Sequence, residues 1–286
     1  MIASQCFTTG RIEAAVGYAD AGQTVIGSGR GAVPFGLEGG LGTVYAAIGQ
    51  PERWVEFCRT QLARGHDTHT LARQCLVLAL TIAGAGEEAR AAANGLIEAA
   101  EATHNPFALS CALHASGWAF RDADPVRALE ALRRGLVIAQ DSGNRGVESH
   151  LTMVLSRLEA EHGDPLAALD HITLAIRNCY DSGHVARIRS ALATLAVVLD
   201  RLGRLEPAAT IAGFAFSPLT ALFPQLSTAI THLRDVLGDQ TYESLARKGE
   251  TMTTTAMVTY AYDQIDQART ELEQPADSTA NTKDRH

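Results

Sequence analysis

Two stretches of the sequence decide the fold: DPVRALEALRRGLVIAQDSG at residues 124–143 and DPLAALDHITLAIRNCYDSG at residues 164–183. They align without a gap at an offset of 40 residues and share Asp-Pro, Ala-Leu and Asp-Ser-Gly. Asp favours the N-cap of a helix, Pro favours its first turn, and Gly favours the left-handed residue that ends it. Each stretch therefore predicts one complete helix, and the offset predicts a repeated unit.

A turn residue recurs along the chain at nearly the same spacing, with steps of 39, 35, 39, 40 and 40 residues: Gly10, Gly49, Gly84, Ala123, Gly163 and Gly203. An apolar helix is expected before each turn. Five residues after most of the turns comes a small residue, with Trp54 as the exception: Ala15, Ala89, Ala128, Ala168 and Ala208. Small residues let two helices approach closely, so the unit is predicted to be a helical hairpin.

The composition is typical of a protein with a buried core, because 46% of the 286 residues are hydrophobic and 20% are charged. No apolar stretch reaches the roughly 20 residues of a spanning helix, and the first residues do not resemble a secretory signal, so we expect a cytoplasmic protein without a membrane partner. The five cysteines lie far apart and do not indicate a disulfide framework or a zinc site.

The charge of the chain argues against nucleic acid as a partner, because its net charge is -8 and DNA binding needs clustered positive charge. Lys248 and Lys283 are the only lysines, and neither lies in a phosphate-binding P-loop pattern. We expect no cofactor and no enzymatic activity.

The repeat resembles the tetratricopeptide pattern, in which a large and a small residue in the first helix precede the turn, as Leu195 and Ala196 precede Gly203. This resemblance implies an all-α, tetratricopeptide-like, right-handed α-solenoid of about six to seven helical hairpins. We expect the repeats over residues 1–216, a C-terminal helical capping segment over 217–273, and a disordered tail over 274–286. Because Met1 falls inside a first helix on this register, the chain is expected to be a piece of a longer ancestor or to dock against something. The alternative is that a short first helix suffices.

The segment LGDQTYESLARKGETMTTTAMVTYAYDQ at residues 237–264 resembles the closing segment of large actinobacterial regulators. These are LuxR-type ATPase transcription regulators and class III adenylyl cyclase–ATPase fusion proteins, and the resemblance is to their helical-repeat region alone. The chain lacks their cyclase, ATPase and DNA-binding domains, so the resemblance implies a role in signal transduction or transcription regulation without catalysis.

Three short motifs are weaker candidates for chemistry. The glycine-rich stretch from Gly27 to Gly31 is interpreted as a loop between helices, and His66 with His69 as a solvated loop without a third metal ligand. A helix-turn-helix around Lys248 is disfavoured, because the helix that follows offers apolar side chains in place of basic ones.

We therefore expect a non-catalytic protein-interaction and regulatory module that binds a protein partner through the concave surface of the solenoid. The partner is an ATPase domain, a cyclase domain or a second copy of the chain. The alternative is a sensor of a small effector, as in a LuxR-type regulator, although only 6% of the residues are aromatic. The residues predicted to line the partner-binding groove are Arg121, His150, Arg157, Glu161, Ser190, Asp200 and Arg201.

Overall fold

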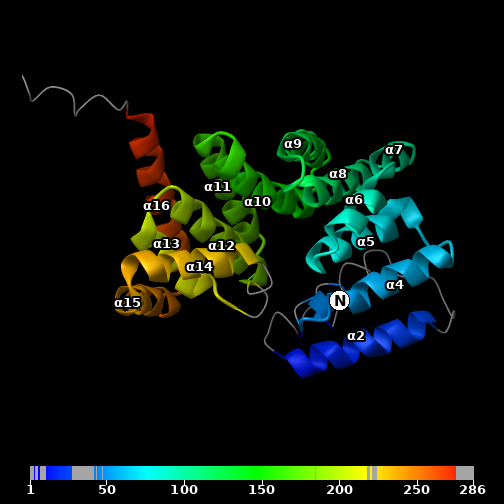
Figure 1. The fold of residues 1–286 in the computed structure, drawn as a ribbon, viewed down its shortest axis with the longest axis horizontal. Coiled ribbons are helices and arrows are strands. Elements are labelled where there is room, and N and C mark those ends of the chain that lie inside the picture. The colour runs from blue at the N-terminus through cyan, green and yellow to red at the C-terminus, as the bar shows by residue number, and fades with distance from the viewer. Residues whose placement is uncertain are drawn as a thin grey trace, which may run out of the picture.

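The computed structural model describes residues 3, 6, 11–27, 42, 44–46, 48–183, 185–217, 220 and 224–274, and every regular element in these residues is a helix. The predicted all-α class is therefore confirmed for this part of the chain. Figure 1 shows the helices following one another along an arch, with α9 near its middle. The α-helices are α2 (Ile12–Gly27), α4 (Pro51–Ala63), α5 (Leu71–Ile82), α6 (Gly86–Ala93), α7 (Leu96–Glu101), α8 (Pro106–Phe120), α9 (Pro125–Asp141), α10 (Arg145–His162), α11 (Pro165–Asp181), α12 (Val185–Arg201), α13 (Leu205–Ala215), α14 (Pro224–Leu237), α15 (Asp239–Glu250) and α16 (Thr254–Glu273), and the 3-10 helix η1 spans Thr68–Thr70.

Neighbouring helices pack as pairs, with α8 against α9, α10 against α11 and α12 against α13. The first helices of successive pairs also contact one another in series, from α8 to α10 to α12. The second helices α9 and α11 make at most isolated contacts with each other over the described residues. Helices on the inner side of a curved stack approach most closely, so α8, α10 and α12 form the inner face of the arch.

The caps of α9 and α11 explain why these helices begin where they do. Asp124 Oδ1 accepts a hydrogen bond from the backbone N–H of Arg127 at 3.1 Å, and Asp164 Oδ1 accepts one from Leu166 at 2.9 Å. The following Pro125 and Pro165 occupy the first turn, where a missing N–H costs nothing. These caps confirm the prediction from the Asp-Pro pairs.

The same two helices end at glycines in the left-handed conformation: Gly143 has φ of 68° and Gly183 has φ of 66°. The predicted turn glycines Gly49, Gly84 and Gly203 also have positive φ, between 73° and 78°. An alanine at such a position would place its Cβ against its own backbone. The predicted turn at Gly10 lies outside the described residues.

The small residue after each predicted turn is buried, which permits close approach of a neighbouring helix. Its exposed fraction is 0% in each predicted case, and Trp54, the exception, is 5% exposed: Ala15, Ala89, Ala128, Ala168 and Ala208. Gly117 of α8 serves the same purpose, since a Cβ there would lie 2.6 Å from a methyl group of Leu132 in α9. The hairpins therefore depend on small side chains for their close packing.

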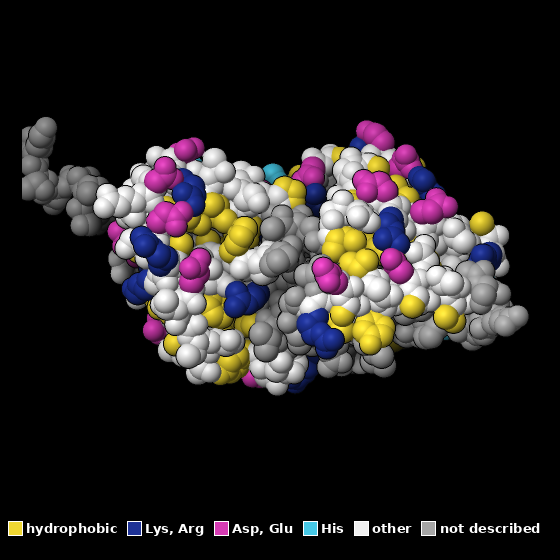
Figure 2. Space-filling model, turned by 90° about the horizontal axis from the view of Figure 1, so that it is seen from below, with side chains coloured by type: hydrophobic (Ala, Val, Ile, Leu, Met, Phe, Trp, Pro, Cys, Tyr) yellow, Lys and Arg dark blue, Asp and Glu magenta, His cyan; other side chains and the backbone are white. Residues whose placement is uncertain are grey.

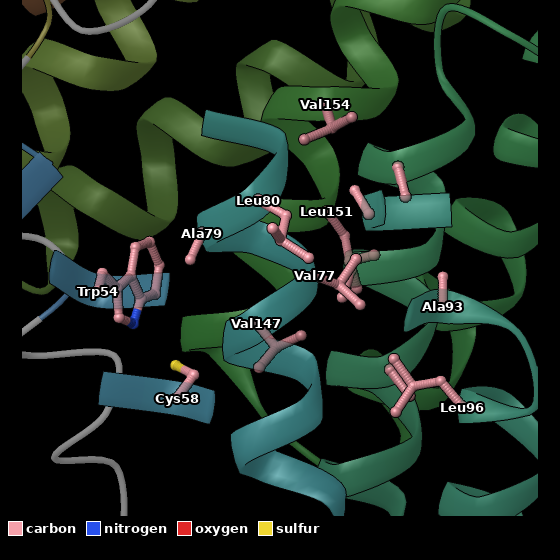
Figure 3. Close-up of a cluster of buried hydrophobic side chains, with 14 of the residues drawn as sticks. Trp54, Cys58, Val77, Ala79, Leu80, Ala93, Leu96, Val147, Leu151 and Val154 are labelled. Carbon is pink, nitrogen blue, oxygen red and sulfur yellow. The ribbon is translucent and has the colours of Figure 1, made fainter. Parts of the chain in front are cut away.

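Two clusters of buried apolar side chains form the core. One extends along the chain from Ala3 to Leu158, and Figure 3 shows part of it, where Val77 and Leu80 of α5 lie in the same cluster as Leu151 of α10. The other extends from Ala168 to Ala268 and joins α11, α12 and α13 to the C-terminal helices. The division falls between α10 and α11.

A stripe of buried polar side chains on α10 marks this division. Ser156 Oγ donates to the backbone carbonyl of Ala168 at 2.8 Å. Glu159, whose side chain is 1% exposed, accepts hydrogen bonds from Nε and Nη2 of Arg133 at 3.0 and 2.6 Å. Buried polar groups are tolerated only when they are hydrogen-bonded, so the stripe fixes how α10 faces α9 and α11.

The C-terminal helices fold back on the pairs before them. The last helix within the predicted C-terminal segment 217–273 is α16, observed at Thr254–Glu273, where it packs against α11 and α13. Arg269 Nη2 in α16 donates to Asp170 Oδ1 in α11 at 2.8 Å. The tail was predicted over residues 274–286; Gln274 is described as the C-cap of α16, and residues 275–286 lie outside the described part.

Helices α13 and α15 cross at two glycines. A Cβ on Gly213 would lie 2.5 Å from Cα of Ala246, and a Cβ on Gly249 would lie 3.0 Å from the carbonyl carbon of Thr210. Only a residue without a side chain permits this backbone separation.

Candidate functional site

The predicted groove residues lie on the three helices of the inner face. Arg121 directly follows α8, and α10 carries His150, Arg157 and Glu161, which are seven and four residues apart and therefore share one side of the helix. Ser190, Asp200 and Arg201 belong to α12. The structure brings some of these residues together and separates others.

Charged side chains of α10, α12 and the turn that follows α8 gather at one end of the inner face. Glu161 on α10 forms an ion pair with Arg201 on α12. Nε of Arg121 lies 3.2 Å from Oδ2 of Asp122. Arg157 interacts electrostatically with all four of these groups. We call these five residues the inner charge cluster.

Arg157 is the most deeply placed member of the inner charge cluster. It is 8% exposed, and its Nη2 finds no hydrogen-bond acceptor among the described residues. Burial, followed by the repulsion of Arg121, lowers the pKa of Arg157 to about 10, although Glu161 opposes this shift. The guanidinium is still protonated at neutral pH, so the cluster holds a buried positive charge with an unused donor.

Aromatic rings continue the inner face away from the charges. The rings of His114 and His150 are stacked with centroids 5.7 Å apart, and the Trp118 ring lies 6.2 Å from that of His114. We call these three residues the ring group. Arg121 joins it to the inner charge cluster, because its guanidinium carbon lies 5.1 Å from the centre of the Trp118 ring. Burial lowers the pKa of His114 to about 4, so its ring is neutral at pH 7.

Two predicted groove residues lie apart from the inner charge cluster. Asp200 faces α14, where its Oδ1 lies 2.8 Å from Nδ1 of His232. Ser190 precedes Arg201 on α12 by about 16 Å of helix, as the rise of about 1.5 Å per residue requires. Its backbone carbonyl accepts a hydrogen bond from Thr194 at 3.2 Å.

Sequence reasoning missed His114, Trp118 and Asp122. The first two lie in the strongly apolar stretch ALSCALHASGWAF and are spaced four residues apart, with Arg121 three residues further on. This spacing places them on one side of a helix and was the available signal. Nothing in the sequence indicated that His150, on a different hairpin, stacks on His114.

The weaker candidate motifs have structural roles where they are described. Asp67 Oδ1 accepts hydrogen bonds from the backbone N–H groups of Ala72 and Arg73 at 3.0 and 3.2 Å, so it caps α5. Among the residues described, no group of three or more His, Cys, Asp or Glu side chains is arranged to hold a metal ion. Most of the stretch from Gly27 to Gly31 lies outside the described residues.

The surface shows no concentration of one charge on the face drawn in Figure 2, where acidic and basic side chains are interspersed over both halves. None of the helices in the described part of the chain is both long enough and apolar enough to cross a membrane.

Comparison with models of known protein families finds no match to the chain. A search of curated proteins also finds no significant match.

Proposed function

We propose that the chain is a tetratricopeptide-like, right-handed α-solenoid that acts as a non-catalytic protein-interaction module in the cytoplasm. A partner segment binds along the inner face and contacts one hairpin after another. The paired helices, the left-handed turn glycines and the buried alanine after each turn support this repeat type. The resemblance of the sequence to the repeat region of ATPase and cyclase regulators supports a signalling or transcription-regulator system as the setting.

The observation that carries the proposal is the continuity of the inner face. The ring group and the inner charge cluster are joined through Trp118 and Arg121, and the ion pair of Glu161 with Arg201 extends the surface to the third hairpin. An extended surface of this kind recognises a polypeptide by complementary shape and charge.

Affinity capture with charge-reversed variants tests the proposal. Arg157→Glu and Arg201→Glu are expected to lose the partners that the wild-type protein retains, because each places negative charge in the inner charge cluster. Arg145→Glu is the matched control, since Arg145 is exposed on the same helix as Arg157. Far-UV circular dichroism of each variant checks that it is folded. Retention of the same partners by both cluster variants would show that the inner face is not the binding surface.

The ring group favours a second candidate function, the binding of a small effector. Stacked rings beside an arginine provide a surface for a planar, charged molecule. A thermal-shift screen against a metabolite panel tests this function, and a true effector raises the melting midpoint with increasing concentration. Trp118→Phe should weaken the shift. A panel without any concentration-dependent shift leaves the polypeptide partner as the better candidate.

A further inference from the structure

Arg157 is an unusual residue to keep at a buried position. It is 8% exposed, and none of the described residues accepts a hydrogen bond from its Nη2. A buried charge with an unused donor destabilises a folded protein, and an apolar side chain of similar size removes that cost. The unpaired buried guanidinium is therefore costly for the fold, and a ligand that reaches it can supply the missing acceptor.

The neighbours of Arg157 do not supply that acceptor. Asp122 lies beside Arg121, with 3.2 Å between Oδ2 and Nε, and Glu161 is engaged by Arg201. The inner charge cluster contains three guanidinium groups and two carboxylates, which leaves one positive charge on Arg157. The chain as a whole is negatively charged, with a net charge of -8, so the positive charge of the cluster stands against the overall charge of the protein.

The shape and the charge of the site define the ligand group. A guanidinium is a planar fork of N–H donors that matches the two oxygens of a carboxylate. A carboxylate carries one negative charge and balances the cluster, whereas a phosphate dianion exceeds the charge available. Arg121 and Arg201 are more exposed than Arg157, with 15% and 40% of their side chains accessible, so a carboxylate that approaches from solvent meets them first.

We propose that Arg157 binds a carboxylate from an acidic side chain of the polypeptide that occupies the inner face. This inference rests on the proposed function and names the chemistry of its partner: a segment with an Asp or Glu side chain over the inner charge cluster. Arg121 and Arg201 steer the acidic group, and the Arg157 fork holds it by paired hydrogen bonds.

The test measures binding of an N-acetylated hexaglutamate peptide by calorimetry at fixed ionic strength, with sodium acetate as the small-acid probe. The wild-type protein is expected to bind the peptide saturably and at least tenfold more tightly than acetate. Arg157→Met should weaken peptide binding at least tenfold. Arg157→Lys should weaken it less, because the lysine keeps the charge but loses the fork. Arg145→Gln, which removes an exposed charge from the same helix, should stay within twofold of the wild type.

Thermal melts of the same ligand-free proteins separate a binding role from a structural one. If Arg157 serves binding, the Arg157→Met protein should melt at or above the wild-type midpoint, because the substitution removes an unpaired buried charge. A midpoint well below that of the wild type, or a failure to fold, would show that Arg157 is structural. Unchanged peptide binding by Arg157→Met and Arg157→Lys would also overturn the inference.

The outcomes distinguish this inference from the proposed function. If the wild-type protein binds neither probe while captured partners still depend on Arg201, the carboxylate site is wrong and the interaction module stands. If acetate binds as tightly as hexaglutamate, the ligand is a small acid, and the assignment to a polypeptide is overturned.

Discussion

Replacing Gly249 with alanine tests how closely α13 and α15 cross. The new Cβ would overlap the carbonyl oxygen of Thr210 and would lie 3.0 Å from its carbonyl carbon and 3.2 Å from the backbone nitrogen of Phe214. Ordinary carbon contacts are about 3.5 to 4.0 Å, so relief of the contact with the carbonyl carbon alone separates the helices by about 0.5 to 1 Å, and relief of the overlap with the oxygen separates them further. All three atoms belong to the backbone, and a change of side-chain rotamer cannot relieve the overlap.

The expected cost follows from two opposing effects. Overpacking of this kind destabilises a protein by about 1 to 3 kcal/mol. Replacement of glycine by alanine inside a helix stabilises by about 1 kcal/mol. Because the clash is with backbone, we expect the upper part of the first range and a net loss of about 1 to 2 kcal/mol in the free energy of unfolding. At about 2 to 4 °C per kcal/mol, the melting midpoint should fall by about 2 to 8 °C.

The matched control is Gly17→Ala in α2, where a Cβ would meet no atom within 4 Å. This substitution keeps the gain in helix propensity without the clash and should stabilise by about 0.5 to 1 kcal/mol. Thermal melts followed by circular dichroism measure both variants, and hydrogen exchange should show faster exchange in α13 and α15 for Gly249→Ala alone. The close crossing is refuted if Gly249→Ala is as stable as the wild-type protein and these helices keep their protection.

Four further substitutions test the caps, the polar stripe and the histidine of the ring group. Asp164→Ala removes the hydrogen bond to the N–H of Leu166 and should cost about 1 kcal/mol in urea denaturation. Arg133→Gln removes the only arginine that pairs with the buried Glu159 carboxylate among the described residues, although the backbone N–H of Asp164 still donates to it, and should cost about 3 kcal/mol. Glu159→Gln should cost less, and equal costs would contradict the buried pair. Burial lowers the pKa of His114 from its ordinary 6.5 to about 4, so between these pH values the unfolded chain binds a proton that the folded protein does not. Stability should therefore fall as the pH drops from 6.5 toward 4, by about 3 kcal/mol in full, and His114→Phe should remove this part of the pH dependence.

The sequence predicts those features that depend on local geometry. The Asp-Pro caps, the left-handed Gly143 and Gly183 and the buried alanines follow from backbone preferences within a few residues, and each is observed. The helix that follows Gly84 is broken at Gly95, which has φ of 71° and separates α6 from α7. The dipeptide Asn94-Gly95 was the available local signal for this break.

The candidate site was predictable only in part, because its residues are assembled from three hairpins. The spacing within α10 indicated that Arg157 and Glu161 share a side. The pairing of Glu161 with Arg201, 40 residues further on, depends on how successive hairpins stack. The partner of Asp200 is His232, which lies beyond the predicted repeats, and the 40-residue period says nothing about such a contact.

The hydrogen bond between α16 and α11 joins residues that are synthesised at different times. Arg269 bonds to Asp170, which precedes it by 99 residues. Translation at about 5 to 20 residues per second puts about 5 to 20 s between the emergence of these two partners from the ribosome. During that interval the side of α11 that α16 will cover is open to chaperones and proteases.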